Sequence, residues 1–338
     1  MKIRLMAISI LIFFYSCVDY KKDEIYTRPN DSIEPKRYTG KNVKYLFSIG
    51  NDSAVVFYNV SSIDVNNNNK TLLILDRGGY KLHIFNLEGN LLKSIGNKGK
   101  GPGEFMSPVF CSNTTDYIIV TEQFIPVAHL FDKDYQYVKD IILPLHPIEI
   151  GSYDEQVIIF GTEANTNKLK IGRFSIKTLK IEEAQIPLQM PYKIEFEKKD
   201  ELIELIWKSV NLAILGNKLF LAYNYQNKLM CYDNGAISWE KTFDFLPNYS
   251  KQIKSGDILL PEEKLIQDID YDNKGNIYVL FGENSKYPNR LIKVFDSKGN
   301  ELKEIILEYE SKSIKIFNSH KIFCLDKNKI FIHCFNLL

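Results

Sequence analysis

The sequence predicts an all-β fold, a six-bladed β-propeller in which an N-terminal strand completes the last blade. The clearest repeat unit is residues 71–108, TLLILDRGGYKLHIFNLEGNLLKSIGNKGKGPGEFMSP, which contains three short strands separated by turn residues. Residues 72–75 form an unbroken apolar run, as expected of a strand covered on both faces, whereas residues 81–85 alternate and residues 91–95 admit polar side chains. Burial should therefore fall from the first strand to the third.

The apolar strand of this unit recurs along the chain. Six such strands begin at Leu72, Tyr117, Val157, Leu219, Ile277 and Ile322, with spacings of 40 to 62 residues. Most are followed by a strand that ends on an aromatic residue and by a hairpin rich in glycine or asparagine. A period of about 40 to 45 residues with four short strands is typical of propeller blades.

The last repeat is incomplete. Residues 314–317, 322–325 and 330–335 supply only three strands, while residues 43–58 contain strand-like segments that precede the first repeat. An N-terminal strand that completes the sixth blade would pair the two ends of the chain. It would also remove the exposed sheet edges that a linear array would leave.

Composition and net charge limit the classes of function that the protein can have. Of the 338 residues, 45% are hydrophobic and 25% charged, and the formal net charge is only +1. A large core is therefore available. Nucleic acid is excluded as a partner, because phosphate binding needs a concentrated basic surface and the lysines here are interleaved with acids.

The N-terminus has the pattern of a secretory signal. Lys2 and Arg4 precede an apolar run, Leu5–Tyr15, which is followed by Ser16 and Cys17. Eleven residues are too few to cross a membrane as a helix, which needs about 20. A small residue directly before a cysteine resembles the bacterial lipobox, with Cys17 as the lipidated first residue. The alternative is an ordinary signal peptide with an incidental cysteine.

This pattern divides the chain into three parts: residues 1–17 as a lipoprotein signal peptide, 18–42 as a flexible tether and 43–338 as the propeller. Within the tether, Lys21-Lys22-Asp23-Glu24 resembles the signal that sends some lipoproteins of Gram-negative bacteria to the outer face of the outer membrane. The expected location is therefore the outer membrane of a Gram-negative cell, with the lipid anchor as the contact to the membrane and exposure at the cell surface as a further expectation.

One stretch resembles a known family. Asp76, the sequence KLHIFNLEGNLLKSIG and the loop Gly99–Phe105 are similar to the NHL-type repeat and to TolB-like, six-bladed β-propeller lipoproteins of bacteria that carry a G-x-G-P-G-E-[FY] loop. The resemblance implies the fold and an envelope location. Because members of that group mostly lack an assigned activity, it implies little about function.

Candidate ligand residues follow from propeller geometry. If the innermost strand of each blade is named a and the outermost d, the b–c turns and the d–a links share one face. Two long d–a insertions, near residues 190–210 and 246–265, extend the same face, and binding usually resides on such loops. The candidate ligand face comprises Asp76, Arg77, Glu104, Glu122, Glu163, Trp207, Tyr249, Glu283 and Tyr287.

Several of these residues have alternative interpretations. Asp76 could cap its own turn, and Glu104 could hold the glycine loop. Trp207 belongs to a helix predicted within residues 198–210, whose apolar stripe could either pack on the propeller or contribute to a ligand floor. Cys111, Cys231, Cys324 and Cys334 lie in apolar runs without metal-binding spacing, which predicts buried free thiols.

No linear catalytic signature is present. The sequence lacks G-x-S-x-G, H-E-x-x-H, an Asp-rich calcium loop and the phosphate-binding G-x-x-x-x-G-K-[ST] pattern. The leading hypothesis is a binding or scaffold module for a glycan, a peptide or an envelope protein, without a cofactor. The alternative is a metal-assisted hydrolase or lactonase-like enzyme, with calcium held by carboxylates near the propeller axis.

Overall fold

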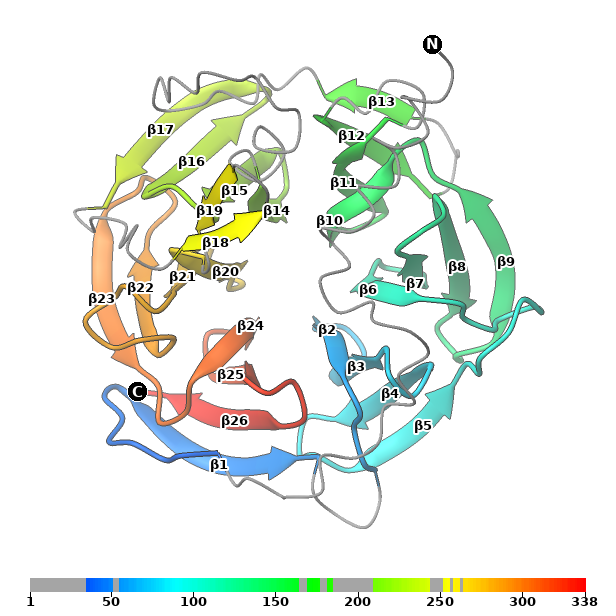
Figure 1. Cartoon of the computed structure of the whole chain (residues 1–338), viewed down its shortest axis with the longest axis horizontal. Coiled ribbons are helices and arrows are strands. Elements are labelled where there is room, and N and C mark those ends of the chain that lie inside the picture. The colour runs from blue at the N-terminus through cyan, green and yellow to red at the C-terminus, as the bar shows by residue number, and fades with distance from the viewer. Residues whose placement is uncertain are drawn as a thin grey trace.

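A computed structural model describes residues 35–50, 55–163, 169–176, 181–184, 209–243, 252–255, 258–261 and 264–338. Six four-stranded antiparallel sheets form a ring around a central axis (Figure 1). The predicted six-bladed propeller is thus confirmed. All six apolar strands found in the sequence are the second strands of their blades.

The blades are built alike, with strand order a-b-c-d from the axis outward. Blade 1 contains β2 (Val60–Asn66), β3 (Thr71–Asp76), β4 (Lys81–Asn86) and β5 (Leu91–Ile95). Blade 2 contains β6 (Pro108–Asn113), β7 (Tyr117–Glu122), β8 (Val127–Asp132) and β9 (Tyr137–Ile142). Blade 3 contains β10 (His146–Tyr153), β11 (Gln156–Thr162), β12 (Leu169–Ser175) and β13 (Ile181–Ala184).

The second half of the chain continues the pattern. Blade 4 contains β14 (Val210–Leu215), β15 (Lys218–Tyr223), β16 (Lys228–Asp233) and β17 (Ala236–Thr242). A separate hairpin, β18 (Gln252–Ser255) and β19 (Ile258–Pro261), precedes blade 5, which contains β20 (Ile266–Tyr271), β21 (Ile277–Phe281), β22 (Leu291–Phe295) and β23 (Glu301–Ile306). Blade 6 contains β24 (Ser311–Phe317), β25 (Lys321–Asp326), β26 (Ile332–Leu337) and β1 (Val43–Ile49).

The ring closes as the sequence predicts. Strand β1 pairs with β26 in antiparallel register, from Val43 opposite Leu337 to Ile49 opposite Ile332. The two ends of the chain therefore share the outer half of blade 6 (Figure 1).

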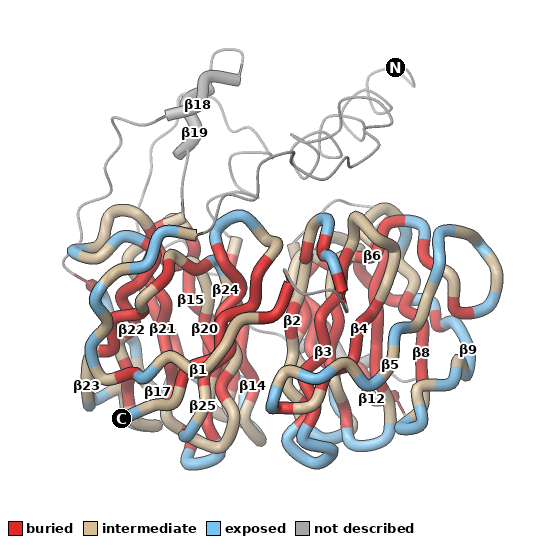
Figure 2. The backbone as a smooth tube through the Cα atoms, turned by 90° about the horizontal axis from the view of Figure 1, so that it is seen from below, coloured by how far each residue is buried: buried red, intermediate tan, exposed pale blue. Residues whose placement is uncertain are grey.

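Burial is highest in the b strands and falls outward through the c and d strands, whereas most of the innermost a strands are only partly buried. Every residue of β3 is buried, and the b strands of the other blades are also mostly buried (Figure 2). Outer strands alternate, and Ile142 at the end of β9 is 81% exposed. This gradient matches the one predicted from the apolar run, the alternating run and the polar run of blade 1.

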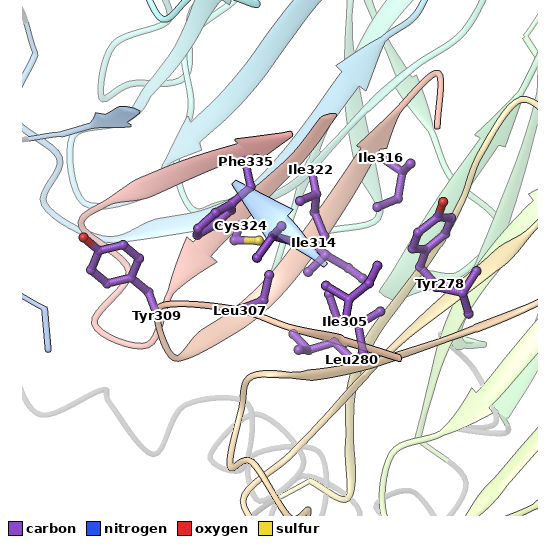
Figure 3. Packing of buried hydrophobic residues seen from close by; sticks show 13 residues of the cluster. Tyr278, Leu280, Ile305, Leu307, Tyr309, Ile314, Ile316, Ile322, Cys324 and Phe335 are labelled. Carbon is purple, nitrogen blue, oxygen red and sulfur yellow. The ribbon is translucent and has the colours of Figure 1, made fainter. Parts of the chain in front are cut away.

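Neighbouring blades pack face to face. Figure 3 shows the cluster between blades 5 and 6, in which Leu280 and Ile305 of one sheet lie close to Ile314, Ile322 and Cys324 of the other. Burial of such side chains stabilises a fold by roughly 1.5 to 3 kcal/mol each. The cysteines at 111, 231, 324 and 334 are buried free thiols, as predicted.

Part of the predicted tether contacts the propeller. The Tyr38 amide donates to the Glu308 carbonyl at 2.8 Å, and Lys41 bridges to Ile306 at the end of β23. The guanidinium of Arg290 lies 3.9 Å from the centre of the Tyr38 ring. Residues 35–42 are therefore bound along blade 5, whereas residues 18–34 lie outside the described residues.

Two further predictions concern helices. The predicted helix within residues 198–210 falls mostly outside the described residues, but Val210, assigned to its end, is the first residue of strand β14. In the part of the chain that the structure describes, no helix is long and apolar enough to span a membrane.

Candidate functional site

Asp76 and Glu122 end the b strands of blades 1 and 2, and both are 1% exposed. The Asp76 carboxylate accepts hydrogen bonds from the amides of Tyr58 at 3.1 Å and Asn59 at 2.8 Å. Glu122 likewise accepts from the amides of Met106 at 2.9 Å and Ser107 at 2.5 Å. Each acid thus binds the backbone of the segment that directly precedes the first strand of its own blade. Both carboxylates therefore face the protein interior.

Glu122 also fixes a histidine. The His129 ring contacts Glu122 Oε1 at 3.1 Å through Nε2 and Asp140 Oδ1 at 2.7 Å through Nδ1. Burial alone would lower the pKa of His129, but hydrogen bonds and charge attraction from the two carboxylates raise it above its usual value. A raised histidine pKa contributes stability that is complete below about pH 6.5 and is lost as the pH rises through the folded-state pKa.

We expect Glu122→Ala to lower the free energy of unfolding by about 2 to 4 kcal/mol, because two buried amides and His129 lose their acceptor. Glu163→Ala is the matched control: Glu163 forms a half-exposed ion pair with Lys170 at 2.8 Å, and its loss should change stability by less than about 1 kcal/mol. Urea unfolding at about pH 6 and about pH 9 measures both, and the Glu122 effect should be larger at the lower pH. Equal effects of the two substitutions would contradict this role.

The glycine-rich loop after blade 1 is also structural. Phe105 is fully buried in the core between blades 1 and 2, and its backbone pairs with Asn97 and Gly99. Glu104 accepts from the Gly101 amide at 2.8 Å, and a Cβ at Gly99 would lie 1.9 Å from the Glu104 carboxylate. The G-x-G-P-G-E-F motif therefore shapes the loop between blades 1 and 2, which the buried Phe105 side chain holds in place.

The other predicted face residues are dispersed. The Arg77 amide donates to the Asn59 carbonyl, and Tyr287 packs partly buried against blade 5. Glu283 pairs with Lys327 at 2.8 Å and lines the axial cavity, which Asp76, Arg77, Glu104, Glu122, Glu163 and Tyr287 do not line. Trp207, Tyr249 and Cys17 lie outside the described residues.

The structure has a polar cavity of about 780 Å³ along the axis. The innermost strand of every blade contributes to its wall: β2, β6, β10, β14, β20 and β24. These are the strands nearest the centre of the ring in Figure 1. The b–c turns of blades 4, 5 and 6 add residues at one end, which we call the loop end.

Three aspartates of the wall join neighbouring blades. Asp64 of blade 1 accepts the Asn113 amide of blade 2 at 2.8 Å, and Asp268 of blade 5 accepts the Ile314 amide of blade 6 at 2.9 Å. Asp270 accepts the Ile316 amide at 2.6 Å. Each innermost strand is a sheet edge with unpaired amides, and these carboxylates satisfy such amides on β6 and β24.

Lys315 balances the charge of these acids. It projects from β24 of blade 6, which lies between blades 5 and 1, and its Nζ is 3.8 Å from Asp270 Oδ1. Burial would lower the pKa of Lys315, but the charges of Asp270, Asp268, Asp64 and Glu149 raise it. Burial raises the pKa of Asp270 to about 7, although Lys315 opposes the shift.

A different set of groups lines the loop end. Burial, together with repulsion from Asp268, raises the pKa of Glu149 to about 7, while Lys264 and Lys315 oppose the shift. Burial lowers the pKa of Lys264 despite attraction to Glu149 and Asp268. Asn289 is 3% exposed, and its Oδ1 has no hydrogen-bond partner among the described residues. Asn289 Oδ1 therefore remains available to a ligand, with Glu149 and Lys264 in the same wall.

The wall does not fit a calcium site. Among the described residues, no group of three or more histidine, cysteine, aspartate or glutamate side chains is placed to hold a metal ion. Asp64, Asp268 and Asp270 each accept amide hydrogens from a neighbouring strand, and Lys315 supplies the cation that balances them. Calcium prefers six to eight oxygen ligands, which these engaged carboxylates do not provide.

Apart from Glu283, the residues that line the cavity were not predicted from the sequence, although a signal existed. Charged residues interrupt the innermost strands, as in SSIDVN, IEIG, IQDIDY and SIKIF. An acid between apolar residues in a strand that opens a propeller blade indicates a face toward a water-filled axis. Closure of the ring determines which of these strands lie near one another. The sequence pattern alone does not give the distances between their charged side chains.

Comparison with known proteins agrees with this architecture. Residues 50–257 match DUF5128, a family described as a 6-bladed beta-propeller. The chain belongs to this family. No curated protein matches the chain.

Solved structures similar to this DUF5128 protein are distant from it in sequence. A member of the duf4221 family from Bacteroides vulgatus has a TM-score of 0.58 at 12% identity, over 87% of this chain and 97% of that chain. A protein of unknown function from Bacteroides thetaiotaomicron has 0.53 at 10%, over 87% and 75%. A streptogramin B lyase has 0.53 at 12%, over 86% and 98%. At these identities the likeness concerns the fold alone.

Proposed function

We propose that this DUF5128 protein is a lipid-anchored binding module of the cell envelope that takes up a small polar ligand, a glycan or peptide fragment, in its axial cavity. The observation that carries the proposal is the loop end of the cavity, which Glu149 and Lys264 line together with Asn289, whose Oδ1 has no hydrogen-bond partner among the described residues. A volume of about 780 Å³ is in the range of small-molecule sites.

Binding is favoured over metal-assisted hydrolysis by the chemistry of the wall. The carboxylates that could have gathered around a cation instead hold backbone amides and Lys315. A pure scaffold would not need unpartnered polar groups within a cavity, because a buried amide oxygen without a partner is destabilising by about 1 to 3 kcal/mol. A ligand hydroxyl that donates to Asn289 Oδ1 would complete this hydrogen bond.

The proposal is tested by attaching a chemical label at the loop end of the cavity, where it should block ligand binding. Lys312 lines the cavity and is exposed, whereas the cysteines at 111, 231, 324 and 334 are buried and should not react. Lys312→Cys in a Cys17→Ser background should therefore take up a single maleimide. Ligand-observed NMR against a panel of glycans and peptides should show binding to the unlabelled variant that the label abolishes.

The matched control for this experiment is Lys274→Cys, because Lys274 is exposed in the a–b turn of blade 5, at the other end of the ring. Its label should leave binding unchanged. If labelling at both positions leaves binding equally strong, or if no compound of the panel binds, the axial site is rejected.

The anchor is supported by the lipobox-like Ser16-Cys17 pair and the polar segment after it. Two or more acyl chains hold a protein durably, at about 0.8 kcal/mol per buried CH₂. We propose the outer membrane of a Gram-negative cell as the location, with the propeller outside the inner membrane.

We expect Cys17→Ser to abolish incorporation of labelled palmitate and to move the protein from the membrane fraction to the soluble fraction. The physical reason is that the proposed acyl chains are attached to Cys17, so the variant lacks its membrane anchor. Cys111→Ser is the control, since Cys111 is buried in blade 2 and should not affect labelling. Palmitate incorporation that persists in Cys17→Ser would refute the anchor.

A further inference from the structure

Two lysines at the loop end of the cavity are not used by the fold. Lys264 precedes β20 and Lys312 lies at the start of β24, so they come from the adjacent innermost strands of blades 5 and 6. Neither forms an ion pair with any residue that the structure describes, whereas the nearby Lys327 pairs with Glu283 at 2.8 Å and Glu310 at 3.3 Å. The positive charge of Lys312 contributes to lowering the pKa of Lys264, so the two cations are close enough to repel.

The nearest acids cannot neutralise both lysines. Asp268 Oδ2 already accepts from Ser313 Oγ at 2.5 Å and from the Ile314 amide at 2.9 Å, and its Oδ1 accepts from the Ile269 amide. Glu149 attracts Lys264, but its own pKa of about 7 leaves it partly protonated at neutral pH. Asp268 is already hydrogen-bonded and Glu149 is only partly charged, so these two acids do not balance the charge of both lysines. The excess positive charge favours binding of an added anion.

A hydrogen-bond acceptor lies beside the same lysines. The Asn289 carbonyl accepts the Ser311 amide at 2.8 Å, which places Asn289 next to the residue that precedes Lys312. Its side-chain Oδ1 has no partner and the residue is 97% buried in the wall of the cavity. A ligand hydroxyl would satisfy this oxygen.

The backbone of Lys264 is fixed by close packing. A Cβ at Gly282 would lie 1.9 Å from the Lys264 carbonyl oxygen, and the Gly282 amide donates to the Leu265 carbonyl at 2.9 Å. The backbone that carries Lys264 therefore rests directly on the end of strand β21. A lysine on a packed backbone loses less entropy on binding an anion than a lysine on a mobile segment does.

We propose that the loop end of the axial cavity binds a hydroxylated organic anion, an acidic saccharide whose carboxylate or phosphate lies between Lys264 and Lys312 and whose hydroxyl donates to Asn289, with a proton taken up by Glu149 on binding. This inference rests on the proposed function and names the chemistry of its ligand. No bond forms or breaks in the step: the proton comes from solvent and stays on the Glu149 carboxyl while the anion is bound.

The proton uptake has a defined sign. The groups that face Glu149 are Asp268 on β20, Lys264 before it, and Lys315 on β24, with Lys312 beside Lys264. A bound anion adds negative charge to this set, which raises the pKa of Glu149 further and favours its neutral form. Affinity should therefore be highest below about pH 7 and fall by about three- to tenfold between about pH 6 and about pH 8.5.

The experiment compares sugars that differ in one charged group, with the full chain carrying Cys17→Ser. Glucuronate, glucose 6-phosphate and glucose are titrated by calorimetry or ligand-observed NMR at about pH 6 and about pH 8.5. We expect both anions to bind at least about tenfold more tightly than glucose, and Lys264→Met and Lys312→Met each to remove about tenfold for the anions only. Lys274→Met, an exposed lysine in the a–b turn of blade 5, should leave affinity unchanged.

The Glu149→Gln variant tests whether proton uptake by Glu149 causes the pH dependence of binding. This variant should bind glucuronate at about pH 8.5 as well as at about pH 6, because glutamine resembles the protonated carboxyl and does not titrate. The pH comparison uses glucuronate, because the phosphate group of glucose 6-phosphate itself titrates between the two pH values. Circular dichroism and the thermal midpoint of each variant verify that it is folded.

The outcomes separate this inference from the proposed function. If glucose binds as tightly as the anions and the label at residue 312 blocks it, the cavity binds ligands but the anion inference is overturned. If neither anion binds at about 100 mM, well above ordinary affinities for such sugars, the inference is overturned, and failure of the whole ligand panel then also rejects the proposed function. Binding of only one of the two anions supports the inference and identifies carboxylate or phosphate as the source of the charge.

Discussion

Lys315→Met is expected to lower the free energy of unfolding by about 3 to 5 kcal/mol at about pH 8, the largest effect of any single substitution in the axial wall. Lys315 is the partly buried cation among Asp64, Asp268 and Asp270, which come from blades 1 and 5 on its two sides. Methionine keeps the length of the side chain but removes its charge. The three carboxylates would then remain close together with no cation to offset their repulsion.

The loss should shrink as the pH falls. Burial already raises the pKa of Asp270 to about 7 with Lys315 present, and burial also raises that of Asp64. A carboxyl whose folded-state pKa is raised above its unfolded value of about 3.9 destabilises the fold at high pH, and this penalty disappears as the pH falls from about 7 toward about 4. Protonation of the acids at low pH therefore replaces the missing cation.

Urea unfolding of the variant and the unsubstituted chain at about pH 8 and about pH 5.5 measures the difference. The difference is more informative than the pH profile of either protein, because His83 and His333, with pKa values lowered by burial to about 4 and about 3, act in the opposite direction in both. Lys312→Met, an exposed lysine on the same strand, should change stability by less than about 0.5 kcal/mol.

A second substitution tests the mechanism. Asp270→Asn in the Lys315→Met background should restore part of the stability, since the asparagine oxygen still accepts the Ile316 amide without adding charge. If Lys315→Met is within about 1 kcal/mol of the unsubstituted chain at about pH 8, the carboxylates do not depend on this lysine.

The sequence predicted the blades better than the site, for a physical reason. An unbroken apolar strand such as Leu72–Leu75 has one favourable location, a central position in a blade, so six such strands at blade spacing indicate the fold. An acid after such a strand has two favourable roles. Asp76 and Glu122 look the same in sequence whether they face a ligand or hold the amides of the preceding link, and the structure shows that they hold amides.

The residues of the axial wall could not be assembled from sequence alone. Glu149, Lys264 and Lys312 lie on three blades and are separated by up to 163 residues of chain. Their convergence depends on how six sheets close radially, which places blade 3 opposite blade 6 (Figure 1). Local pattern determines which strand a residue occupies, whereas closure determines which strands face one another.

That closure can be measured through the seam between β1 and β26. Lys44 lies opposite Asn336 across the seam, and Asn336 also lies opposite Lys321 of β25 within the same sheet. Directly opposed residues of antiparallel strands are close enough for a disulfide. A disulfide between Lys44→Cys and Asn336→Cys closes nearly the whole chain into one loop, whereas one between Lys321→Cys and Asn336→Cys closes a loop of about 15 residues.

The seam disulfide should stabilise the oxidised protein over its reduced form by about 5 kcal/mol, and the local one by about 3 kcal/mol, because loop-closure entropy grows with the length of chain that is closed. Each variant serves as its own reference when denaturant unfolding is compared with and without reductant, and peptide mapping verifies the pairing. In a closed ring, an opening at the seam frees both termini at once, and the cross-link removes this route to unfolding. If the seam disulfide does not form, or if it stabilises the protein less than the local one, β1 does not close the ring in solution.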